Sequence, residues 1–203
     1  ASSSHTYDEA KELTENGFEK TGYTFSGWNT KADGSGTSYQ DKEKVKNLTD
    51  KDEDTVTLYA QWTPEEIKVT FHRNTSSSDT VTAEQTFTYD VAGQKFSDKR
   101  WKRTGYTLSG WSFDQDASEK TYDVLMDVTN GWIASYAPGC DLYAVWIPDD
   151  GTAYTVNHYT KDLGKDTYSL ESTESRTGRT GSTVTASDLR KDIKGFTYEK
   201  AQV

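Results

Sequence analysis

Apolar and polar residues alternate with a period of two along several short segments of the chain, a pattern typical of half-buried β-strands. In DTVTLYAQW (54–62), every second residue from Val56 to Trp62 is apolar. EIKVTFH (66–72) alternates in the same way, and EQTFTY (84–89) supplies a partner strand. The pattern predicts a mostly β (α+β) protein, built from short strands that polar loops connect.

Signals for helices are fewer and shorter. Asp8 is placed to cap a helix over residues 9–13, which are good helix formers and precede an Asn-Gly stop. The matching segment after Asp90 contains Gly93, so its helix is expected to be weaker. A third short helix is expected near the end of the chain, with Ser187 as its cap.

The heptapeptide GYTFSGW (22–28) returns as GYTLSGW (105–111), 83 residues later. The match extends in both directions, and the spacing changes little along it. The other matched pairs are TYD at 6–8 and 88–90, Phe18 and Trp101, Tyr39 and Tyr122, and LYAQW at 58–62 with LYAVW at 142–146. Self-similarity at a nearly fixed spacing is the signature of an internal repeat.

The repeated heptapeptide has two interpretations. In the first, its glycines mark turns or close backbone approaches, and Trp28 and Trp111 belong to the interior of their units. In the second, the aromatic residues form an exposed platform for a ligand. Each unit has few other large apolar groups, and a buried aromatic ring removes about 150–250 Å² from water. The pattern therefore favours the interior.

This arrangement resembles the internalin-type B repeat, also called the Listeria–Bacteroides repeat. That family has a GYTFxGW box, a loop rich in Gly, Ser and Asp, and a closing LYAxW strand. Residues 67–146 resemble a full copy, to which NGWIASYAPGC (130–140) adds at one edge. The resemblance implies tandem small β-grasp-like modules, each a mixed sheet with a short helix. It also implies a secreted or wall-attached protein of a bacterial surface.

We expect three parts in the chain. The first repeat (residues 1–62) lacks an opening strand unless that strand lies upstream or elsewhere, and the second repeat (63–147) resembles a full copy. The C-terminal segment (153–203) starts with a predicted two-strand meander and is similar to part of a mucin-binding-protein-type repeat. The acidic linkers TPEE (63–66) and IPDDG (147–151) each contain a proline and mark the boundaries.

Composition narrows the classes of function. With 33 acidic and 23 basic residues, the formal net charge is −10, and the basic footprint of a nucleic-acid-binding protein is missing. We expect no membrane insertion either, because the sequence contains no run of about 20 apolar residues. Cys140 is the single cysteine, so an internal disulfide cannot form. From how it opens and stops, the chain is interpreted as an excerpt of a longer protein.

No group of residues predicts catalysis. His5, His72 and His158 lie in different parts of the chain without a shared ligand spacing, which argues against a zinc site. Cys140 has no base beside it in the sequence and is interpreted as an inert thiol, with a nucleophile as the alternative. Counting carboxylates cannot exclude a two-carboxylate hydrolase, but units this small rarely provide the cleft. We expect a non-enzymatic chain with no catalytic residue, metal or cofactor.

Two acidic loops, KADGSG (31–36) and TDKDED (49–54), offer carboxylate oxygens of the kind that calcium prefers. Neither loop follows the twelve-residue ligand order of a helix–loop–helix site, and a solvated loop is the favoured alternative. Neither calcium binding nor an intramolecular isopeptide crosslink is decided by the sequence.

Two functions fit this organisation, and both place the chain outside the cell, at a bacterial cell surface or cell wall. In the first, a monomer with modules in series is the non-catalytic stalk or spacer of an adhesin. In the second, exposed aromatic rings bind a host glycan or glycoprotein, because sugar faces stack on such rings. The candidate rings are Tyr59, Tyr143, Trp101 and Trp132. The pattern favours the stalk and assigns no definite ligand-binding residue.

Overall fold

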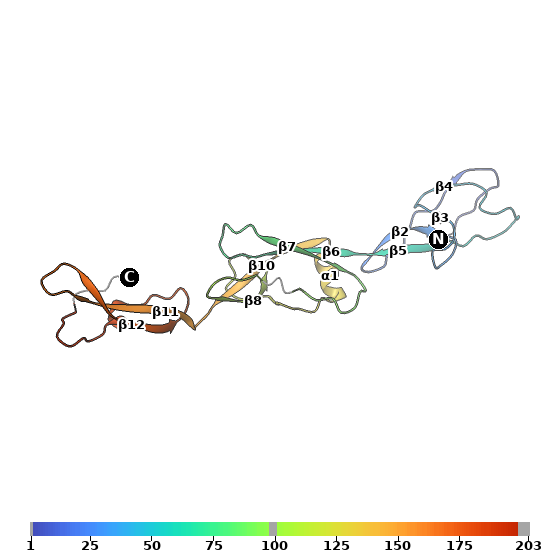
Figure 1. Cartoon of the computed structure of the whole chain (residues 1–203). Helices are drawn as coiled ribbons and strands as arrows, with labels where there is room; N and C mark the ends of the chain where they lie inside the picture. Colours follow the sequence, from blue (N-terminus) through green and yellow to red (C-terminus); the bar gives the residue numbers. More distant parts are fainter. Residues whose placement is uncertain (1, 98–100, 199–203) are drawn as a thin grey trace. The chain divides into compact units, whose positions relative to one another are not determined.

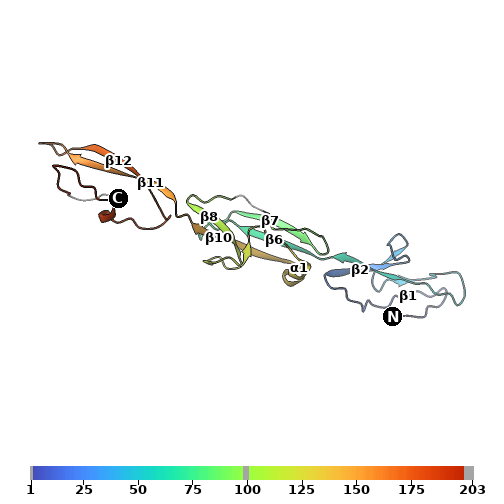
Figure 2. The ribbon, with the colours of Figure 1, turned by 90° about the horizontal axis from the view of Figure 1, so that it is seen from below.

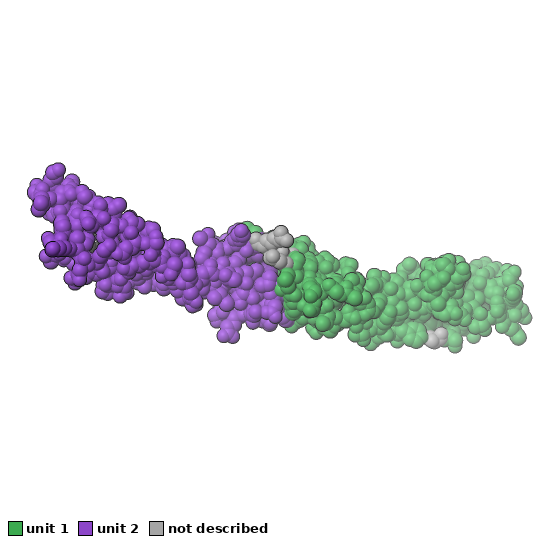
Figure 3. All heavy atoms as spheres, turned by 60° about the horizontal axis from the view of Figure 1, so that its bottom comes forward, with its two compact units in different colours: residues 1–72, 81–98, 125–142 green, residues 73–80, 99–124, 143–203 purple. Residues whose placement is uncertain are grey.

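The computed structural model describes residues 2–97 and 101–198. Their regular structure is mostly strand, as the alternation predicts, and the chain divides into two compact units (Figure 3). One unit comprises residues 1–72, 81–98 and 125–142, and the other comprises residues 73–80, 99–124 and 143–203. The elements of the first repeat are β1 (Lys11–Glu12), β2 (Tyr23–Asn29), β3 (Ser38–Tyr39), β4 (Lys44–Val45) and β5 (Tyr59–Pro64). The second repeat holds β6 (Glu66–His72), β7 (Thr82–Thr88), β8 (Tyr106–Ser112), β9 (Tyr122–Asp123), α1 (Asn130–Tyr136) and β10 (Gly139–Pro148).

The second repeat contains a five-stranded sheet with the order β7-β6-β10-β8-β9. Both β7 beside β6 and β8 beside β10 are antiparallel pairs, and β6 and β7 lie side by side in Figures 1 and 2. Along β6, the Lys68 amide donates to the Pro138 carbonyl, and His72 lies against Asp141. Since the contacts advance together along β6 and β10, the two strands run in the same direction. The sheet is therefore mixed, as the resemblance implies.

The buried core of the described residues lies mainly in the second repeat. Ile67, Val69 and Phe71 alternate along β6 and are fully buried, whereas the residues between them are exposed or half-buried. Phe96 packs against Phe71 with ring centroids 5.2 Å apart in an edge-to-face arrangement, and it also contacts Phe87. These rings supply large apolar area in a chain that has few aliphatic residues.

The first repeat has a three-stranded sheet with the order β3-β2-β5 (Figure 1). A separate antiparallel pair joins β1 with β4. Among its described residues, Leu13 and Val45 are the large apolar side chains that are buried. Strand β5 begins at Tyr59, so the strand predicted over 54–62 forms only in its second half and continues to Pro64. Within the described residues, the largest sheet of the first repeat thus has three strands and that of the second has five, and the core of the first repeat is smaller.

The helix predicted at residues 9–13 is wrong. Asp8 has a φ of 63°, and its backbone amide donates to Asn47 Oδ1 at 2.7 Å while Asn47 Nδ2 donates back to the Asp8 carboxylate at 3.0 Å. This reciprocal pair holds a left-handed turn in place of a helix cap, and the chain then enters β1. Asp90 has a φ of 62° and forms the same two bonds with Asn130, so the weaker helix expected there is also absent.

The helix of the second repeat lies in the added segment, at α1, where Thr129 caps it by accepting a hydrogen bond from the Trp132 amide. In the C-terminal segment the predicted meander is confirmed as β11 (Thr152–Lys161) and β12 (Tyr168–Gly178), an antiparallel pair. The helix predicted to start at Ser187 is only a single 3-10 turn at Ala186–Leu189. Among the described residues, the second repeat has an α-helix and the other two modules do not.

Each copy of the heptapeptide lies, from its tyrosine onward, in a strand of seven residues, β2 in the first repeat and β8 in the second. The glycine before each tryptophan faces the neighbouring strand. A side chain at Gly27 would lie 2.8 Å from the Tyr39 carbonyl oxygen, and one at Gly110 would collide with the Tyr122 carbonyl oxygen. The box needs glycine at this place because the next strand's backbone occupies the space of a β-carbon.

Candidate functional site

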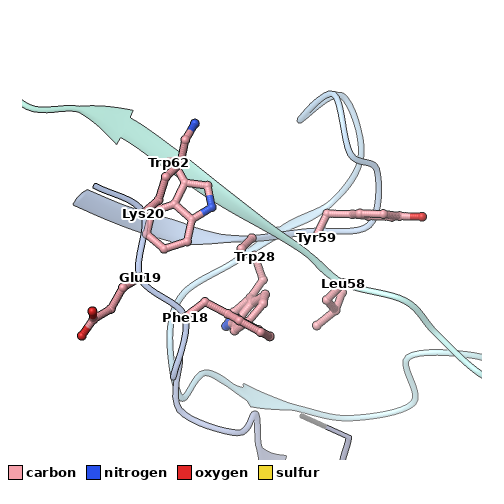
Figure 4. A pocket seen from close by; sticks show the side chains of 8 residues that line it. Phe18, Glu19, Lys20, Trp28, Leu58, Tyr59 and Trp62 are labelled. Carbon is pink, nitrogen blue, oxygen red and sulfur yellow. The ribbon is translucent and has the colours of Figure 1, made fainter. Parts of the chain in front are cut away.

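A groove of about 450 Å³ lies on the first repeat (Figure 4). Its walls come from the segment before β2, from β2 itself, and from β5 with the residue before it. They are Phe18, Glu19, Lys20, Trp28, Leu58, Tyr59, Ala60 and Trp62. The lining is largely aromatic and aliphatic, which suits an apolar partner or the face of a sugar ring better than an ion.

Edge-to-face ring contacts shape the groove. Phe25 lies between Trp28 and Trp62, with centroid distances of 5.0 and 5.5 Å. Phe18 meets Trp28 at 6.3 Å and remains 53% exposed. Figure 4 shows the rings of Phe18 and Trp28 next to each other, with Leu58 beside them. The indole of Trp28 is half-buried, so its position differs from the full interior place that the sequence favours.

The second repeat buries three of the residues that correspond to this groove. Trp111 and Leu142 have no exposed surface, whereas their counterparts Trp28 and Leu58 are half-buried. Ala144 is likewise buried. The local geometry is otherwise the same, because Trp111 receives an edge contact from Trp101 at 6.0 Å, as Trp28 does from Phe18. The difference in burial therefore comes from the segments that pack over these residues in each repeat.

A backbone junction links the first heptapeptide to the beginning of the second repeat. The Gly22 carbonyl accepts from the Glu65 amide at 2.8 Å, and the Glu65 carbonyl accepts from the Tyr89 amide at 2.9 Å. The rings of Tyr23 and Tyr89 pack edge-to-face, and the Tyr23 hydroxyl donates to the Asp90 carboxylate. This hydrogen bond to Asp90 raises the pKa of Tyr23. Gly22 has a φ of 75° and lies under the Tyr89 ring, so no side chain fits there.

The second heptapeptide makes an equivalent junction with the C-terminal segment. The Gly105 carbonyl accepts from the Asp149 amide at 2.8 Å, and the Asp149 carbonyl accepts from the Thr180 amide at 2.9 Å. Gly105 also has a φ of 75°, and a side chain there would collide with Thr180. The Thr107 hydroxyl also donates to the Asp149 carboxylate, and the hydroxyls of Thr152 and Thr180 are hydrogen-bonded to each other. The two junctions thus share the same backbone pattern, and the sequence pattern alone did not indicate this role for the first glycine of the box.

The four candidate platform rings do not share one environment. Tyr59 is 43% exposed and lines the groove of the first repeat. Trp132 packs against Phe87 and Phe96, with centroid distances of 6.2 and 5.4 Å, and so belongs to an interior ring cluster. Trp101 and Tyr143 are half-buried. Of the four, Tyr59 is the ring that the groove brings to a candidate site.

The histidines lie apart, as their spacing suggests. His72 contacts Asp141 at 2.7 Å, His158 lies 3.7 Å from Glu174, and His5 contacts Ser3. Within residues 2–97 and 101–198, no three His, Cys, Asp or Glu side chains come together in a way that could hold a metal ion.

The acidic loop 31–36 is organised by Asn29, a residue that the sequence analysis missed. Asn29 is buried, its Oδ1 accepts from the Lys31 and Gly36 amides, and its Nδ2 donates to the Gly34 carbonyl. Within the loop, hydrogen bonds from Ser35 hold the pKa of Asp33 below its usual value. An asparagine directly after the Gly-Trp pair and before a glycine-rich loop is the signal that could have identified it.

Cys140 will react slowly with thiol reagents in the folded chain. Burial, with a smaller effect of Asp141, raises the pKa of Cys140 to about 11. At pH 8 the thiolate is therefore scarcer than in a free cysteine, and the reaction with Ellman's reagent should slow on the order of 100-fold. The same chain in urea is the control and should react at the ordinary rate. Equal rates in the two conditions would contradict the burial of this thiol.

No helix in the described part of the chain is long and apolar enough to cross a bilayer. Residues 1–61 and 68–137 each match the family model of the Listeria-Bacteroides repeat domain. No solved structure matches the chain.

Two proteins of Evansella cellulosilytica are similar to parts of the chain. One, named "Putative Gly-rich membrane protein", is 35% identical over 104 residues, which are 51% of this chain and 12% of that protein. The other, named "Putative membrane protein", is 32% identical over 112 residues, which are 52% of this chain and 15% of that protein. The chain thus spans a small part of the length of these relatives.

Proposed function

The chain belongs to the Listeria–Bacteroides repeat family, and from this membership we propose that it is a non-catalytic spacer in a bacterial surface protein. In this function, tandem repeats act as a stalk that carries other parts of an adhesin away from the cell. The names of the two relatives, which are those of membrane proteins, support a location at the cell surface.

The observation that carries this proposal is the recurrence of one junction at two places. A spacer must transmit position from one module to the next, which a flexible linker does poorly. Gly22 with Glu65 and Gly105 with Asp149 fasten the end of each repeat to the start of the next segment through backbone hydrogen bonds. The Pro-containing linkers therefore contribute to strands and turns with fixed partners.

The alternative function is the binding of a host glycan or glycoprotein by the groove of the first repeat. It is favoured by one specific observation, the exposed rings of Phe18 and Tyr59 beside half-buried Trp28 and Trp62. Aromatic rings are enriched at recognition sites because they offer large rigid contact area.

Small-angle X-ray scattering of the full chain tests the spacer. We expect a distance distribution with the long tail of modules in series and little flexibility in the Kratky plot. As a matched control, inserting Gly-Ser-Gly-Ser between Glu65 and Glu66 should break the first junction and raise the flexibility. A compact particle, or an insertion without any effect on the scattering, would contradict the spacer.

A glycan and mucin array tests the alternative. If the chain is a spacer, we expect no binding to the array above background. Saturable binding that Tyr59→Ala abolishes, with an unchanged circular dichroism spectrum, would instead assign recognition to the groove.

A further inference from the structure

The two junctions have the same backbone hydrogen bonds but different side chains at one place. The amides that complete the two junctions belong to Tyr89 and Thr180. The next residue lies in the left-handed region in both cases, Asp90 with a φ of 62° and Gly181 with a φ of 75°. At this place the first junction therefore has a carboxylate, and the second has no side chain.

The carboxylate of Asp90 is shared between the two repeats. Its Oδ2 accepts a hydrogen bond from the hydroxyl of Tyr23, in the first repeat. Its Oδ1 accepts from Nδ2 of Asn130 at 2.6 Å, and Asn130 is the first residue of α1 in the second repeat. The Asp90 amide also donates to Asn130 Oδ1 at 2.9 Å. One aspartate thus connects the first heptapeptide with the start of α1.

The tyrosines of the two heptapeptides are held alike, except at their hydroxyl groups. A basic side chain three residues earlier covers each ring. Lys20 Nζ lies 3.4 Å from the ring centroid of Tyr23, and the Arg103 guanidinium lies 3.8 Å from that of Tyr106. A β-carbon at Gly181 would lie 3.6 Å from the Tyr106 hydroxyl. This hydroxyl is therefore close to the place where the second junction has no carboxylate.

We propose that the shared carboxylate of Asp90 couples the docking of the first repeat to the folding of the second. Tyr23 and Asn130 bind different oxygens of this carboxylate, so each hydrogen bond fixes its orientation for the other. Hydrogen bonds to an ionised acceptor are also stronger than those between neutral groups. The start of α1 is therefore more stable while the Tyr23 hydroxyl is in place.

This coupling distinguishes the two junctions. Repeats that stabilise each other across their interface unfold together as a cooperative block. The two Listeria–Bacteroides repeats form such a block, whereas the C-terminal segment, joined at Gly181 without a carboxylate, separates from the second repeat in an easier transition. A spacer needs modules with fixed positions but does not need them to unfold together, so the coupling goes beyond that function.

Tyr23→Phe in the full chain is the first test, because it removes the hydroxyl and keeps the ring. Hydrogen–deuterium exchange with mass spectrometry follows the amides of Ile133 and Ala137, which donate within α1 and at its end. We expect these amides to exchange about fivefold faster, the effect of one lost hydrogen bond to a charged acceptor at a partly exposed place.

Asp90→Asn tests whether the two hydrogen bonds act through one carboxylate. Asparagine keeps the left-handed turn but has a single acceptor oxygen, which cannot serve both Tyr23 and Asn130. We expect the same amides of α1 to exchange faster, and Tyr23→Phe to add nothing further in the double variant. Effects that add would mean that the two bonds are independent, and would overturn the proposal.

The second junction allows the carboxylate to be added. Tyr106→Phe should leave the exchange of the Thr180 amide unchanged, because Gly181 offers that hydroxyl no acceptor side chain. Gly181→Asp supplies one. We expect the Thr180 amide to exchange about fivefold more slowly than in Gly181→Ala, which has the same backbone strain. Adding Tyr106→Phe to Gly181→Asp should cancel this gain.

The proposal is wrong if Tyr23→Phe leaves the exchange of α1 unchanged. It is also wrong if Gly181→Asp and Gly181→Ala protect the Thr180 amide equally. The scattering profile that tests the spacer is measured on the unsubstituted chain, so neither of these results depends on it.

Discussion

Replacing Trp111 with alanine will lower the free energy of unfolding of the second repeat by about 3–5 kcal/mol, the range for large aromatic residues in a core. The indole has no exposed surface, and its Nε1 donates to the Val124 carbonyl at 3.2 Å. The substitution leaves a cavity and removes the edge contact between Trp111 and Trp101. Urea unfolding, with hydrogen exchange of peptides from each repeat, measures the loss separately for the two repeats.

Trp28→Ala is the matched control because the two residues occupy the same place in the heptapeptide. Trp28 is half-buried, and its Nε1 lies 3.4 Å from the Asp41 carboxylate, a weak hydrogen bond. Less area returns to water on truncation, so we expect a loss of about 1–3 kcal/mol. Equal losses at the two positions would mean that the groove of the first repeat is closed in solution.

Alternation of apolar and polar residues was enough to predict the strands that have one buried face. Along β6 the period of two is regular from Ile67 to Phe71, and all three inward residues are buried. The partner strand β7 followed from the same local signal, since a second alternating run comes shortly after the first. The tandem organisation followed from the repeated heptapeptide, whose two copies form equivalent strands.

Contacts between residues far apart in the sequence explain what local patterns failed to predict. Asp8 looked like a helix cap, but its partner is Asn47, 39 residues away, and their hydrogen bonds hold a left-handed turn. Residues 9–13 then enter β1 although they are good helix formers, because tertiary contacts override a weak propensity. The helix predicted after Asp90 is absent for the same reason, because Asp90 is hydrogen-bonded to Asn130, 40 residues away.

The candidate site was predictable only in part. The sequence identified the aromatic residues that line the groove. It did not distinguish half-buried Trp28 from buried Trp111, because their local sequences differ by one residue within the heptapeptide. Burial depends on the strands that cover each copy, and this is a property of the whole sheet. The same limit hid the position of Trp132 between Phe87 and Phe96.

Gly110→Ala will lower the free energy of unfolding of the second repeat by about 2–4 kcal/mol. The added methyl group would collide with the Tyr122 carbonyl oxygen, which belongs to the paired strand β9 and cannot rotate away. The φ of 159° is also a conformation that residues with a side chain rarely adopt. Backbone strain and overpacking each cost about 1–3 kcal/mol. A slight separation of the two strands lowers both costs, so we expect a total below the sum of the two upper values.

Two further glycines calibrate this loss in the same urea experiment. Gly27→Ala meets the Tyr39 carbonyl at 2.8 Å, a less severe overlap, so we expect a smaller loss in the first repeat. Gly131→Ala lies in α1 with only Thr129 Oγ1 nearby, at 3.9 Å, and should be neutral or stabilise by about 0.5–1 kcal/mol. If Gly110→Ala behaves like Gly131→Ala, the strand after the heptapeptide does not approach its glycine. The box would then keep that glycine for a reason other than packing.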